Sequence, residues 1–427
     1  MEHHSVPVTP LLSRFAKRRR FLGRALLAAL GILLALALDF SPVVPEAKPP
    51  IAEQAQRVRG IVEQLRAQLR GNNGLATLRL DHGYLTSAAT LASQLKKFGR
   101  IDGRIDNKEM TIRVSRRFGY LWVNGEARVG SSTRGFPDVA LKIGDLPLGR
   151  ILSRWIVQLA RHTVRSRGVD VPPVNDLVRS IDVQNNVVSI NIHMPLGGAF
   201  ANDLSNFRSQ PVDAAQTAAI YCQLIKRNKK SPTTDMVVVV RRAFAQTGSA
   251  LPMIEQNRSA LVALAMYAVS PDSGRLAGDA TQRIRACRGS NDAPLLAGRT
   301  DLANHWALSA ALAVSLGADV GRAMGEWKEL SDSRPGGTGF SFVDLAADRA
   351  GLALARRATD PATAVATAKR LQSADTEYLL PIRALALSEG LTEQQFVTGF
   401  KTINSAQFNA AKARIDKVLA KSTQQTR

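Results

Sequence analysis

An uninterrupted apolar run near the N-terminus constrains this chain more than any other feature. The run, "ALLAALGILLALAL", occupies residues 25–38, and a basic block, "RFAKRRRFLGR", precedes it at residues 14–24. Fourteen apolar residues suit the hydrophobic region of a signal peptide. Residues 21–23 extend the run to about the length of a short membrane span if Arg24 snorkels. The sequence favours an uncleaved anchor over residues 21–40, with a cleaved signal peptide as the alternative.

Both alternatives predict the same compartment. Basic flanks remain on the cytoplasmic side of a membrane, so residues 1–20 form a cytoplasmic tail and the rest of the chain is exported. We therefore expect a single-pass protein of a bacterial inner membrane whose bulk is periplasmic. The only two cysteines, Cys222 and Cys287, lie in the exported part. An oxidising compartment permits a disulfide between them, and two separate buried thiols are the alternative.

The charge of the chain predicts its partners. The sequence has 57 basic and 35 acidic residues, a net charge of +22, which attracts polyanions. The basic residues are scattered, no nucleic-acid motif accompanies them, and export argues against nucleic acid. Anionic lipid headgroups or acidic envelope polymers are the expected partners, besides the membrane itself through residues 21–40. The chain has no HExxH, CxxC or GxSxG motif and no phosphate-binding glycine loop.

Residues 41–73 are expected to form a proline-rich spacer, "SPVVPEAKPP", followed by an amphipathic helix. Apolar residues of that helix recur at alternating spacings of four and three, which makes a narrow apolar seam. The seam permits a short coiled coil that forms a homodimer through residues 51–69, or a helix docked on the next domain. The residues of the seam are Ile51, Ala55, Val58, Val62, Leu65 and Leu69.

Residues 74–195 are predicted to form a β-rich module with two helices, because β-branched residues alternate with polar ones between turn signals. "QNN" at 184–186 is typical of a hairpin turn. The second helix, at 149–166, is amphipathic, and its apolar stripe either covers a sheet or presses onto an anionic membrane. "LKIGDLPLGRIL" resembles a segment of small exported lipid-binding β-domains. The overall fold class is α+β: an anchor helix, this module and a C-terminal all-α domain.

The C-terminal helical domain is predicted over residues 212–420, where Ala- and Leu-rich segments alternate with Gly, Pro, Asn and Asp. Three of its helices are expected at about 300–316, 319–333 and 343–358. The connection "GAD" at 317–319 forces the first two to run antiparallel, which places His305 and Glu329 at one height. Asp332 shares a face with Glu329, and Asp344 and Asp348 begin the third helix beyond a glycine-rich turn. One imidazole and four carboxylates thus converge.

Two kinds of chemistry suit this set. One is a divalent metal ion held by His305, Glu329, Asp332, Asp344 and Asp348, since hard cations prefer oxygen ligands and imidazole adds affinity for transition metals. The other is hydrolysis with His305 as a general base and Glu329 or Asp348 as an acid. No other cofactor is indicated.

A structural network is the alternative to a functional site. In that interpretation Asp332 ends a helix, Asp344 lies at a helix N-terminus, and Ser341 caps that helix. Glu329 then pairs with Arg349, and the two phenylalanines of "GFSF" (339–342) form a hydrophobic plug.

The segment "GRTDLANHWALSAALA…GEWKELSDSRPGGTGFSFVDLAADRAG" (298–351) resembles a family of uncharacterised proteobacterial membrane-anchored proteins. It is more distantly similar to YfiM-like periplasmic lipoproteins. "QNRSALVALAMY" (256–267) and "LTEQQFVTGF" (391–400) resemble further segments of the first family. The resemblance implies a site but no established activity, and the chain has no lipobox cysteine. The matching residues are His305, Lys328, Glu329, Asp332, Gly339, Asp344, Ala347, Asp348 and Gly351.

Overall fold

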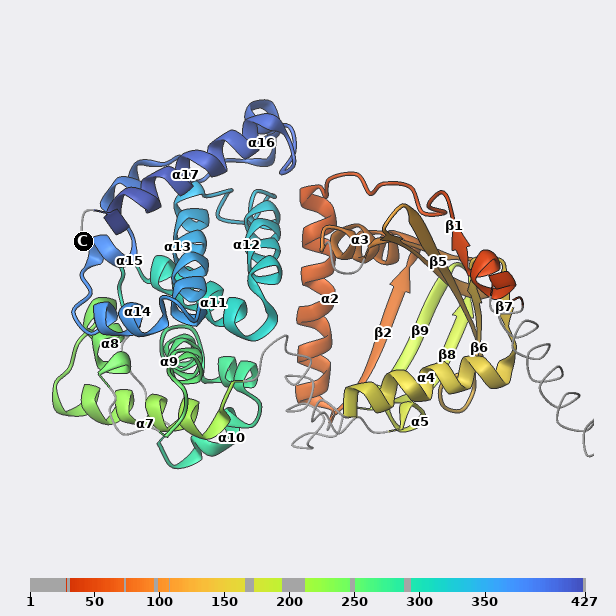
Figure 1. Ribbon diagram of the computed structural model, residues 1–427, viewed down its shortest axis with the longest axis horizontal. Helices are drawn as coiled ribbons and strands as arrows, with labels where there is room; N and C mark the ends of the chain where they lie inside the picture. The colour runs from red at the N-terminus through yellow and green to blue at the C-terminus, as the bar shows by residue number, and fades with distance from the viewer. Residues whose placement is uncertain are drawn as a thin grey trace, which may run out of the picture.

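A long helix, α2 (Ala52–Gly71), lies between two lobes of different architecture in the computed structural model (Figure 1). The α/β lobe comprises residues 38–193 apart from α2 itself, and the helical lobe comprises residues 212–424. This mixed architecture, with antiparallel sheets first and helices after them, is the coarse fold class that the sequence predicts. The structure describes residues 28, 31–72, 74–95, 99–106, 108–165, 173–193, 212–245, 250–287 and 293–424.

Residues 21–27, 29 and 30 of the predicted membrane anchor lie outside the described residues. Residues 31–37 are helical, and Ile32, Leu33 and Leu34 in that stretch are exposed. Within the part of the chain that the structure describes, no helix combines the length and the apolarity needed to cross a bilayer.

The α/β lobe contains two antiparallel sheets. The first has six strands in the order β3-β4-β5-β6-β7, with β1 added against β5. The second has three strands in the order β2-β9-β8. The strands of the first sheet are β1 (Leu38–Asp39), β3 (Arg100–Ile105), β4 (Glu109–Phe118), β5 (Leu121–Gly130), β6 (Val139–Ile143) and β7 (Leu146–Leu148). Those of the second are β2 (Leu75–Asp81), β8 (Val178–Gln184) and β9 (Val187–His193).

Alternation along the strands builds the core of this lobe, because every second side chain faces inward. Residues from both sheets form one buried cluster: Ile105, Met110, Val129, Ile181, Val183 and Val188. The "QNN" hairpin is confirmed between β8 and β9, where Asn185 and Asn186 adopt φ of 50° and 60°. Asparagine tolerates this left-handed conformation, which a two-residue hairpin turn requires at both positions.

Helices α3 (His82–Ser93), α4 (Arg150–Arg165) and α5 (Val174–Leu177) complete the α/β lobe. α4 packs against β6 and β7, as one of the two interpretations of its stripe expects. That contact does not use all of the stripe, because Leu152, Trp155 and Leu159 are exposed.

The proline-rich segment 41–50 is not a free spacer, because a buried amide holds its first half on the α/β lobe. Asn124 Oδ1 accepts hydrogen bonds from the Val43 amide at 3.1 Å and from Ser115 Oγ at 2.6 Å. Asn124 Nδ2 donates to Asp39 Oδ2 at 2.6 Å and to the Ser41 carbonyl at 3.0 Å. A buried side chain that satisfies so many polar groups of another segment fixes that segment in place. The first half of the segment therefore lies on the α/β lobe.

α2 docks on both lobes. It packs against α3 and β2 on one side and against α12 (Ala318–Asp332) on the other. Ala52 and Ala55 are buried in the core of the helical lobe. These contacts agree with the docked-helix interpretation of the apolar seam, and the homodimer through residues 51–69 stays a prediction.

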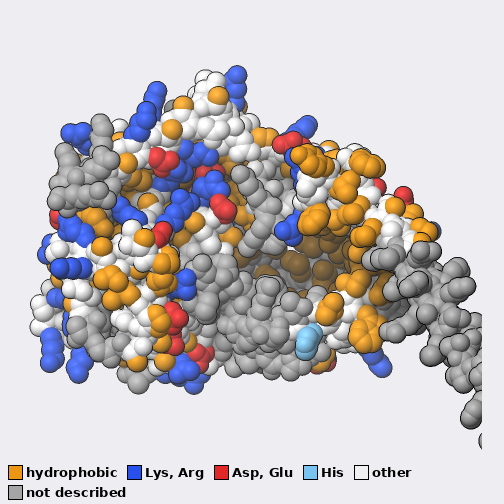
Figure 2. Space-filling view, in the orientation of Figure 1, with side chains coloured by type: hydrophobic (Ala, Val, Ile, Leu, Met, Phe, Trp, Pro, Cys, Tyr) orange, Lys and Arg blue, Asp and Glu red, His pale blue; other side chains and the backbone are white. Residues whose placement is uncertain are grey.

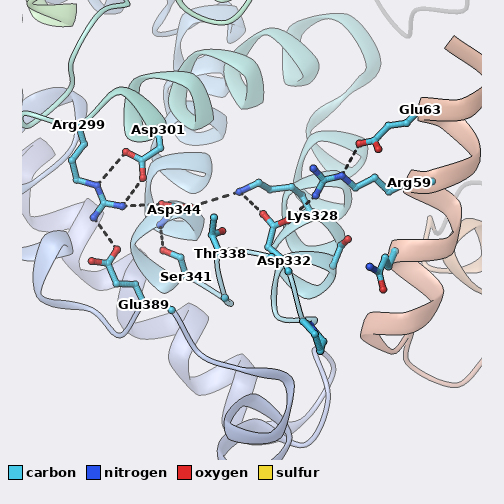
Figure 3. A pocket seen from close by; sticks show the side chains of 18 residues that line it. Arg59, Glu63, Arg299, Asp301, Lys328, Asp332, Thr338, Ser341, Asp344 and Glu389 are labelled. Carbon is cyan, nitrogen blue, oxygen red and sulfur yellow. Dashed lines mark hydrogen bonds and ion pairs between the residues drawn. The ribbon is translucent and has the colours of Figure 1, made fainter. Parts of the chain in front are cut away.

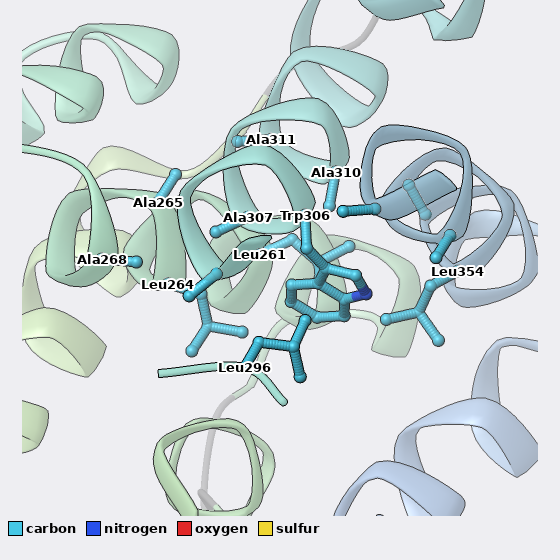
Figure 4. Packing of buried hydrophobic residues seen from close by; sticks show 14 of the residues in the cluster. Leu261, Leu264, Ala265, Ala268, Leu296, Trp306, Ala307, Ala310, Ala311 and Leu354 are labelled. Carbon is cyan, nitrogen blue, oxygen red and sulfur yellow. The ribbon is translucent and has the colours of Figure 1, made fainter. Parts of the chain in front are cut away.

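The helical lobe surrounds one continuous core with Trp306 near its centre (Figure 4). The indole is fully buried among leucines and alanines, and its Nε1 donates to the Leu379 carbonyl at 3.1 Å.

The Cys222–Cys287 disulfide is present, with the two Cα atoms 5.4 Å apart. The α-helices are α7 (Ala214–Lys230), α8 (Met236–Phe244), α9 (Met253–Ala268), α10 (Ala280–Arg283), α11 (Thr300–Leu316), α12, α13 (Phe342–Thr359), α14 (Ala364–Leu371), α15 (Thr376–Leu379), α16 (Glu393–Phe400) and α17 (Ala406–Gln424). Three short 3-10 helices are η3 (Pro271–Ala277), η4 (Arg285–Cys287) and η5 (Ile382–Ala386).

An aromatic cluster fixes the glycine-rich loop that joins α12 to α13. Phe340 stacks on Phe396 with ring centroids 4.5 Å apart, and Phe342 lies 4.8 Å from Phe400. Phe408 of α17 contacts all four of these rings. The hydrophobic plug predicted for "GFSF" is confirmed, and it holds the loop against α16 and α17.

We expect Phe408→Ala to lower the free energy of unfolding by about 3–5 kcal/mol, because it removes a fully buried ring and leaves a cavity. Phe118→Ala is the matched control, because its ring is exposed, and its effect should stay within about 0.5 kcal/mol. Urea denaturation followed by circular dichroism measures both. Equal effects of the two substitutions would contradict the packing described here.

Candidate functional site

Three consecutive helices build the site, as the sequence predicts. α11 and α12 are joined at Gly317 and run antiparallel, and α13 follows the glycine-rich loop. His305 Nε2 of α11 lies 3.7 Å from Glu329 Oε1 of α12, so the two residues do sit at one height. Gly351 lets α13 approach α11 closely, because a Cβ atom at that position would collide with the Trp306 carbonyl.

His305 binds a different acid at each nitrogen. Its Nδ1 lies 3.0 Å from Asp348 Oδ1, which also accepts a hydrogen bond from Ser309 Oγ at 2.6 Å. Its Nε2 lies 3.3 Å from Asp344 Oδ2. Burial and the charge of Lys328 lower the pKa of His305. The charge of Asp348 and hydrogen bonds to Asp344 and Asp348 outweigh them and raise the pKa to about 10.

The Lys328 ammonium lies at the centre of the acids. Its Nζ is 2.8 Å from Glu329 Oε1, 2.9 Å from Asp332 Oδ2 and 3.7 Å from Asp344 Oδ2. Buried carboxylates repel one another unless a cation balances them, and Lys328 supplies that charge from within the chain. Burial lowers the pKa of Lys328, but the charge of Glu329 and hydrogen bonds to Glu329 and Asp332 outweigh it and raise the pKa.

Lys328 also contacts the imidazole. Its Nζ lies 2.8 Å from His305 Nε2, a distance at which one nitrogen must offer a lone pair for a hydrogen bond. Loss of a proton from either residue therefore creates a hydrogen bond between them. The protonation states of the two bases are therefore coupled.

Glu329 is the most deeply buried acid of the site, with no exposed surface. Its Oε2 accepts a hydrogen bond from the Ser341 amide at 3.0 Å, and its Oε1 faces Lys328. Burial and the charge of Asp344 raise the pKa of Glu329 to about 7, although Lys328 and His305 oppose the shift. A carboxyl group that titrates near neutral pH is suited to proton transfer.

Asp344 stays ionised. Burial raises its pKa, but the hydrogen bond and charge of His305, together with Lys328 and Arg299, lower it below its usual range. Arg299 lies 3.6 Å away and also binds Asp301 at 2.5 Å and Glu389 at 2.8 Å. Asp344 therefore presents a fixed negative charge at the edge of the site.

A cavity of about 840 Å³ opens beside these residues, between α2 and the glycine-rich loop (Figure 3). Lys328, Asp332 and Asp344 line it from the helical lobe, whereas His305 and Glu329 lie behind them. Arg59 of α2 closes one side and binds Asp332 at 2.6 Å. Basic and acidic side chains both reach the cavity, which therefore suits a ligand that carries charge.

The loop that floors the cavity depends on glycine at Gly339. Its φ is +88°, and a Cβ atom there would collide with the backbone of Gly390. The Gly339 amide donates to the Asp332 carbonyl at 2.7 Å, which ties the loop to the end of α12. A larger residue at this position would displace the loop from the cavity.

Three of the five predicted metal ligands can face one ion. The ligand atoms of His305, Glu329 and Asp344 lie within 4.8 Å of one another. Asp348 faces the opposite imidazole nitrogen, so it orients His305 rather than sharing an ion at Nε2. Asp332 is held by Lys328 and Arg59. A metal ion fits the three ligands only after the Lys328 ammonium moves, because Nζ lies within 3.7 Å of all three.

Several features of the structural interpretation are also present. Ser341 caps α13 by accepting a hydrogen bond from the Asp344 amide at 3.0 Å, and Asp332 is the last residue of α12. The predicted pair of Glu329 with Arg349 is wrong, because Arg349 binds Asp416 of α17. Glu329 pairs instead with its own neighbour in sequence, Lys328.

Four residues of the site were not predicted from the sequence. Ser309 lies one turn after His305, and that spacing could have identified it. Arg299 stands two residues before Asp301 in "GRTD", a weaker signal. Arg59 lies 273 residues from Asp332 along the chain, and Glu389 lies 45 residues from Asp344. No local pattern indicates either residue.

Comparison with models of protein families, with curated proteins and with solved structures finds no match to this chain.

The raised pKa of Glu329 makes stability depend on pH. The folded state binds a proton more tightly than the unfolded state, whose carboxyl titrates near 4.5, so stability should fall as pH rises from 4.5 to about 7. We expect Glu329→Gln to remove a decline on the order of 3 kcal/mol across this range. The measurement is urea denaturation at several pH values.

Glu393→Gln is the matched control, because Glu393 pairs with Arg334 but is partly exposed. Its pH profile should parallel that of the wild type. If the Glu329→Gln profile also parallels the wild type, Glu329 does not titrate as described.

Proposed function

We propose that the helical lobe is a hydrolytic site that works by proton transfer on a small charged ligand. The observation that carries the proposal is a chain of close contacts, from Asp348 Oδ1 to His305 Nδ1 and from His305 Nε2 to Lys328 Nζ, that ends at the wall of a cavity. An ion-pair network with a structural role alone requires neither an adjacent cavity nor a buried acid, such as Glu329, whose pKa is about 7.

Each residue has a distinct role in this proposal. Lys328 is partly exposed, reaches the cavity and donates a proton to the leaving group, while a water molecule attacks the ligand and releases a proton that restores the Lys328–His305 pair. His305, 2.8 Å behind it, returns a proton to Lys328, and Asp348 holds the imidazole in the orientation that permits the transfer. Glu329 supplies a second proton-accepting group near neutral pH. Asp344 and Arg299 present fixed charges that orient the ligand.

A metal-dependent form of the same reaction is a narrower proposal. His305, Glu329 and Asp344 would hold a divalent ion after Lys328 turns outward, and the ion would polarise a bound water or ligand oxygen. The position of Lys328 among these ligand atoms favours the metal-independent form.

The location of the protein belongs to the same proposal. The basic block and the apolar run support a single-pass protein of the bacterial inner membrane whose two lobes lie in the periplasm. Of the predicted anchor, residues 21–40, Leu38 and Asp39 pair with β5 and belong to the folded lobe. The disulfide agrees with an oxidising compartment. The net charge of +22 supports contact with anionic lipid or acidic envelope polymers. The proposed relationship to the uncharacterised membrane-anchored family rests on the matching residues given above.

A second candidate function, lipid binding or scaffolding without catalysis, is favoured by the α/β lobe. Leu152 and Trp155 of α4 are exposed, and Figure 2 shows a hollow in this lobe with hydrophobic side chains on its walls. Such a role does not involve Lys328, so substitutions in the helical lobe distinguish the two functions.

The test is hydrolysis of a panel of nitrophenyl esters, phosphates and glycosides by the full-length protein, with and without EDTA. We expect turnover of at least one class that EDTA does not abolish, and a loss of about 100-fold in Lys328→Met. Lys412→Met is the matched control, because Lys412 is also partly buried and ion-paired, with Glu326 at 3.2 Å, but lies away from the cavity. Equal rates in both variants and the wild type would contradict the role of Lys328. Loss of activity in EDTA would favour the metal-dependent form.

A further inference from the structure

We propose that the tip of the β4–β5 hairpin rests on the headgroup region of an anionic lipid bilayer. The hairpin tip consists of Arg116, Arg117, Phe118 and Tyr120, with Phe40 beside them. The inference rests on the membrane location proposed above and adds a second contact with the bilayer, made by the folded lobe itself.

The aromatic rings of the hairpin tip are exposed. Tyr120 is 91 % exposed, Phe40 is 90 % exposed and Phe118 is 73 % exposed. Phe118 pairs with Leu121 across the hairpin. On the other side of β5, Asp39 pairs with Trp122, and the antiparallel register places the next residue, Phe40, beside Leu121. The three rings therefore gather at one end of the first sheet, where Figure 2 shows hydrophobic side chains grouped over β1 and β5. A group of exposed aromatic rings marks an interaction surface.

Positive charge surrounds these rings. Arg116 and Arg117 are exposed and immediately precede Phe118. Arg100 lies over the Trp122 ring, 4.9 Å from its centroid, and also pairs with Glu46 at 3.5 Å. Residues 116–122, "RRFGYLW", contain no acidic side chain. Aromatic rings at headgroup level with arginines among them are typical of segments that lie in the interface of an anionic membrane.

The apolar run enters the fold beside the hairpin tip, which favours a bilayer over another partner. Leu38, the last residue of the run, pairs with Val123, three residues and about 10 Å along β5 from Tyr120. Asn124 holds residues 39–43 on the lobe, so this separation is fixed. Ile32, Leu33 and Leu34, within the run, are exposed as well. A bilayer that holds the run therefore lies within reach of the rings.

A single labelled cysteine tests the contact. Cys222 and Cys287 form the disulfide, so Tyr120→Cys introduces the only free thiol of the chain. The full-length variant is labelled with the polarity-sensitive fluorophore NBD and reconstituted into vesicles of phosphatidylglycerol and phosphatidylcholine. We expect a blue shift, an intensity increase of several fold, and quenching by nitroxide-labelled lipid.

Val365→Cys is the control, because Val365 is similarly exposed but lies on α14 of the helical lobe, and its label should stay in water. Arg116→Ser with Arg117→Ser should weaken the signal at position 120 in phosphatidylglycerol vesicles while leaving the protein bound through its anchor.

The outcomes separate this inference from the proposed location. If the protein sediments with vesicles but the label at 120 stays in water, the hairpin tip does not touch the bilayer, although the anchor stands. If the protein does not sediment with vesicles, the membrane location fails and the inference fails with it. An equal signal in pure phosphatidylcholine overturns the preference for anionic lipid. A blue shift without vesicles indicates a protein contact and overturns the inference.

Discussion

The arrangement of the helical lobe depends on one cation among its acids, the partly exposed Lys328 ammonium. It lies within 3.7 Å of three carboxylates and 2.8 Å from the imidazole of His305. Arg59 and Arg299 pair with Asp332 and Asp344, but the fully buried Glu329 would keep only the imidazole of His305, at 3.7 Å, as a cationic partner if Lys328 were removed. A buried charge without a close partner costs several kcal/mol. The glycine-rich loop between α12 and α13 is fixed by its phenylalanines and holds the acids of both helices in place. The acids therefore need both the ammonium and the loop.

The same charges connect the two lobes. Asp332 accepts from Lys328 within the helical lobe and from Arg59 across the cavity, so α2 is tied to the end of α12. Ala52 and Ala55 add apolar contact to the same junction. A ligand in the cavity would touch both sides, which links the chemistry of the helical lobe to the segment that leads back to the N-terminus. α2 is therefore part of the site and not only a connection.

Sequence reasoning succeeded where local spacing determines structure. The short connection at Gly317 places His305 level with Glu329, and the "QNN" turn makes a hairpin, because both follow from chain geometry over a few residues. It failed where partners are distant. Arg59 meets Asp332 from 273 residues away along the chain, and Arg349 turns toward Asp416 of the last helix. The prolines of residues 41–50 indicated a free spacer, but one buried amide, Asn124, holds the beginning of this segment on the sheet.

A double-mutant cycle between Lys328 and Glu329 tests the central claim most directly. Lys328→Met and Glu329→Gln, alone and combined, are unfolded in urea at pH 8, where the free energy of unfolding is compared among the four proteins. If Lys328 balances the buried acids, Lys328→Met alone is strongly destabilising and the double variant recovers part of the loss, with a coupling energy of about 1.5 kcal/mol or more. Effects that add within about 0.5 kcal/mol would contradict the claim that this one cation holds the acids together.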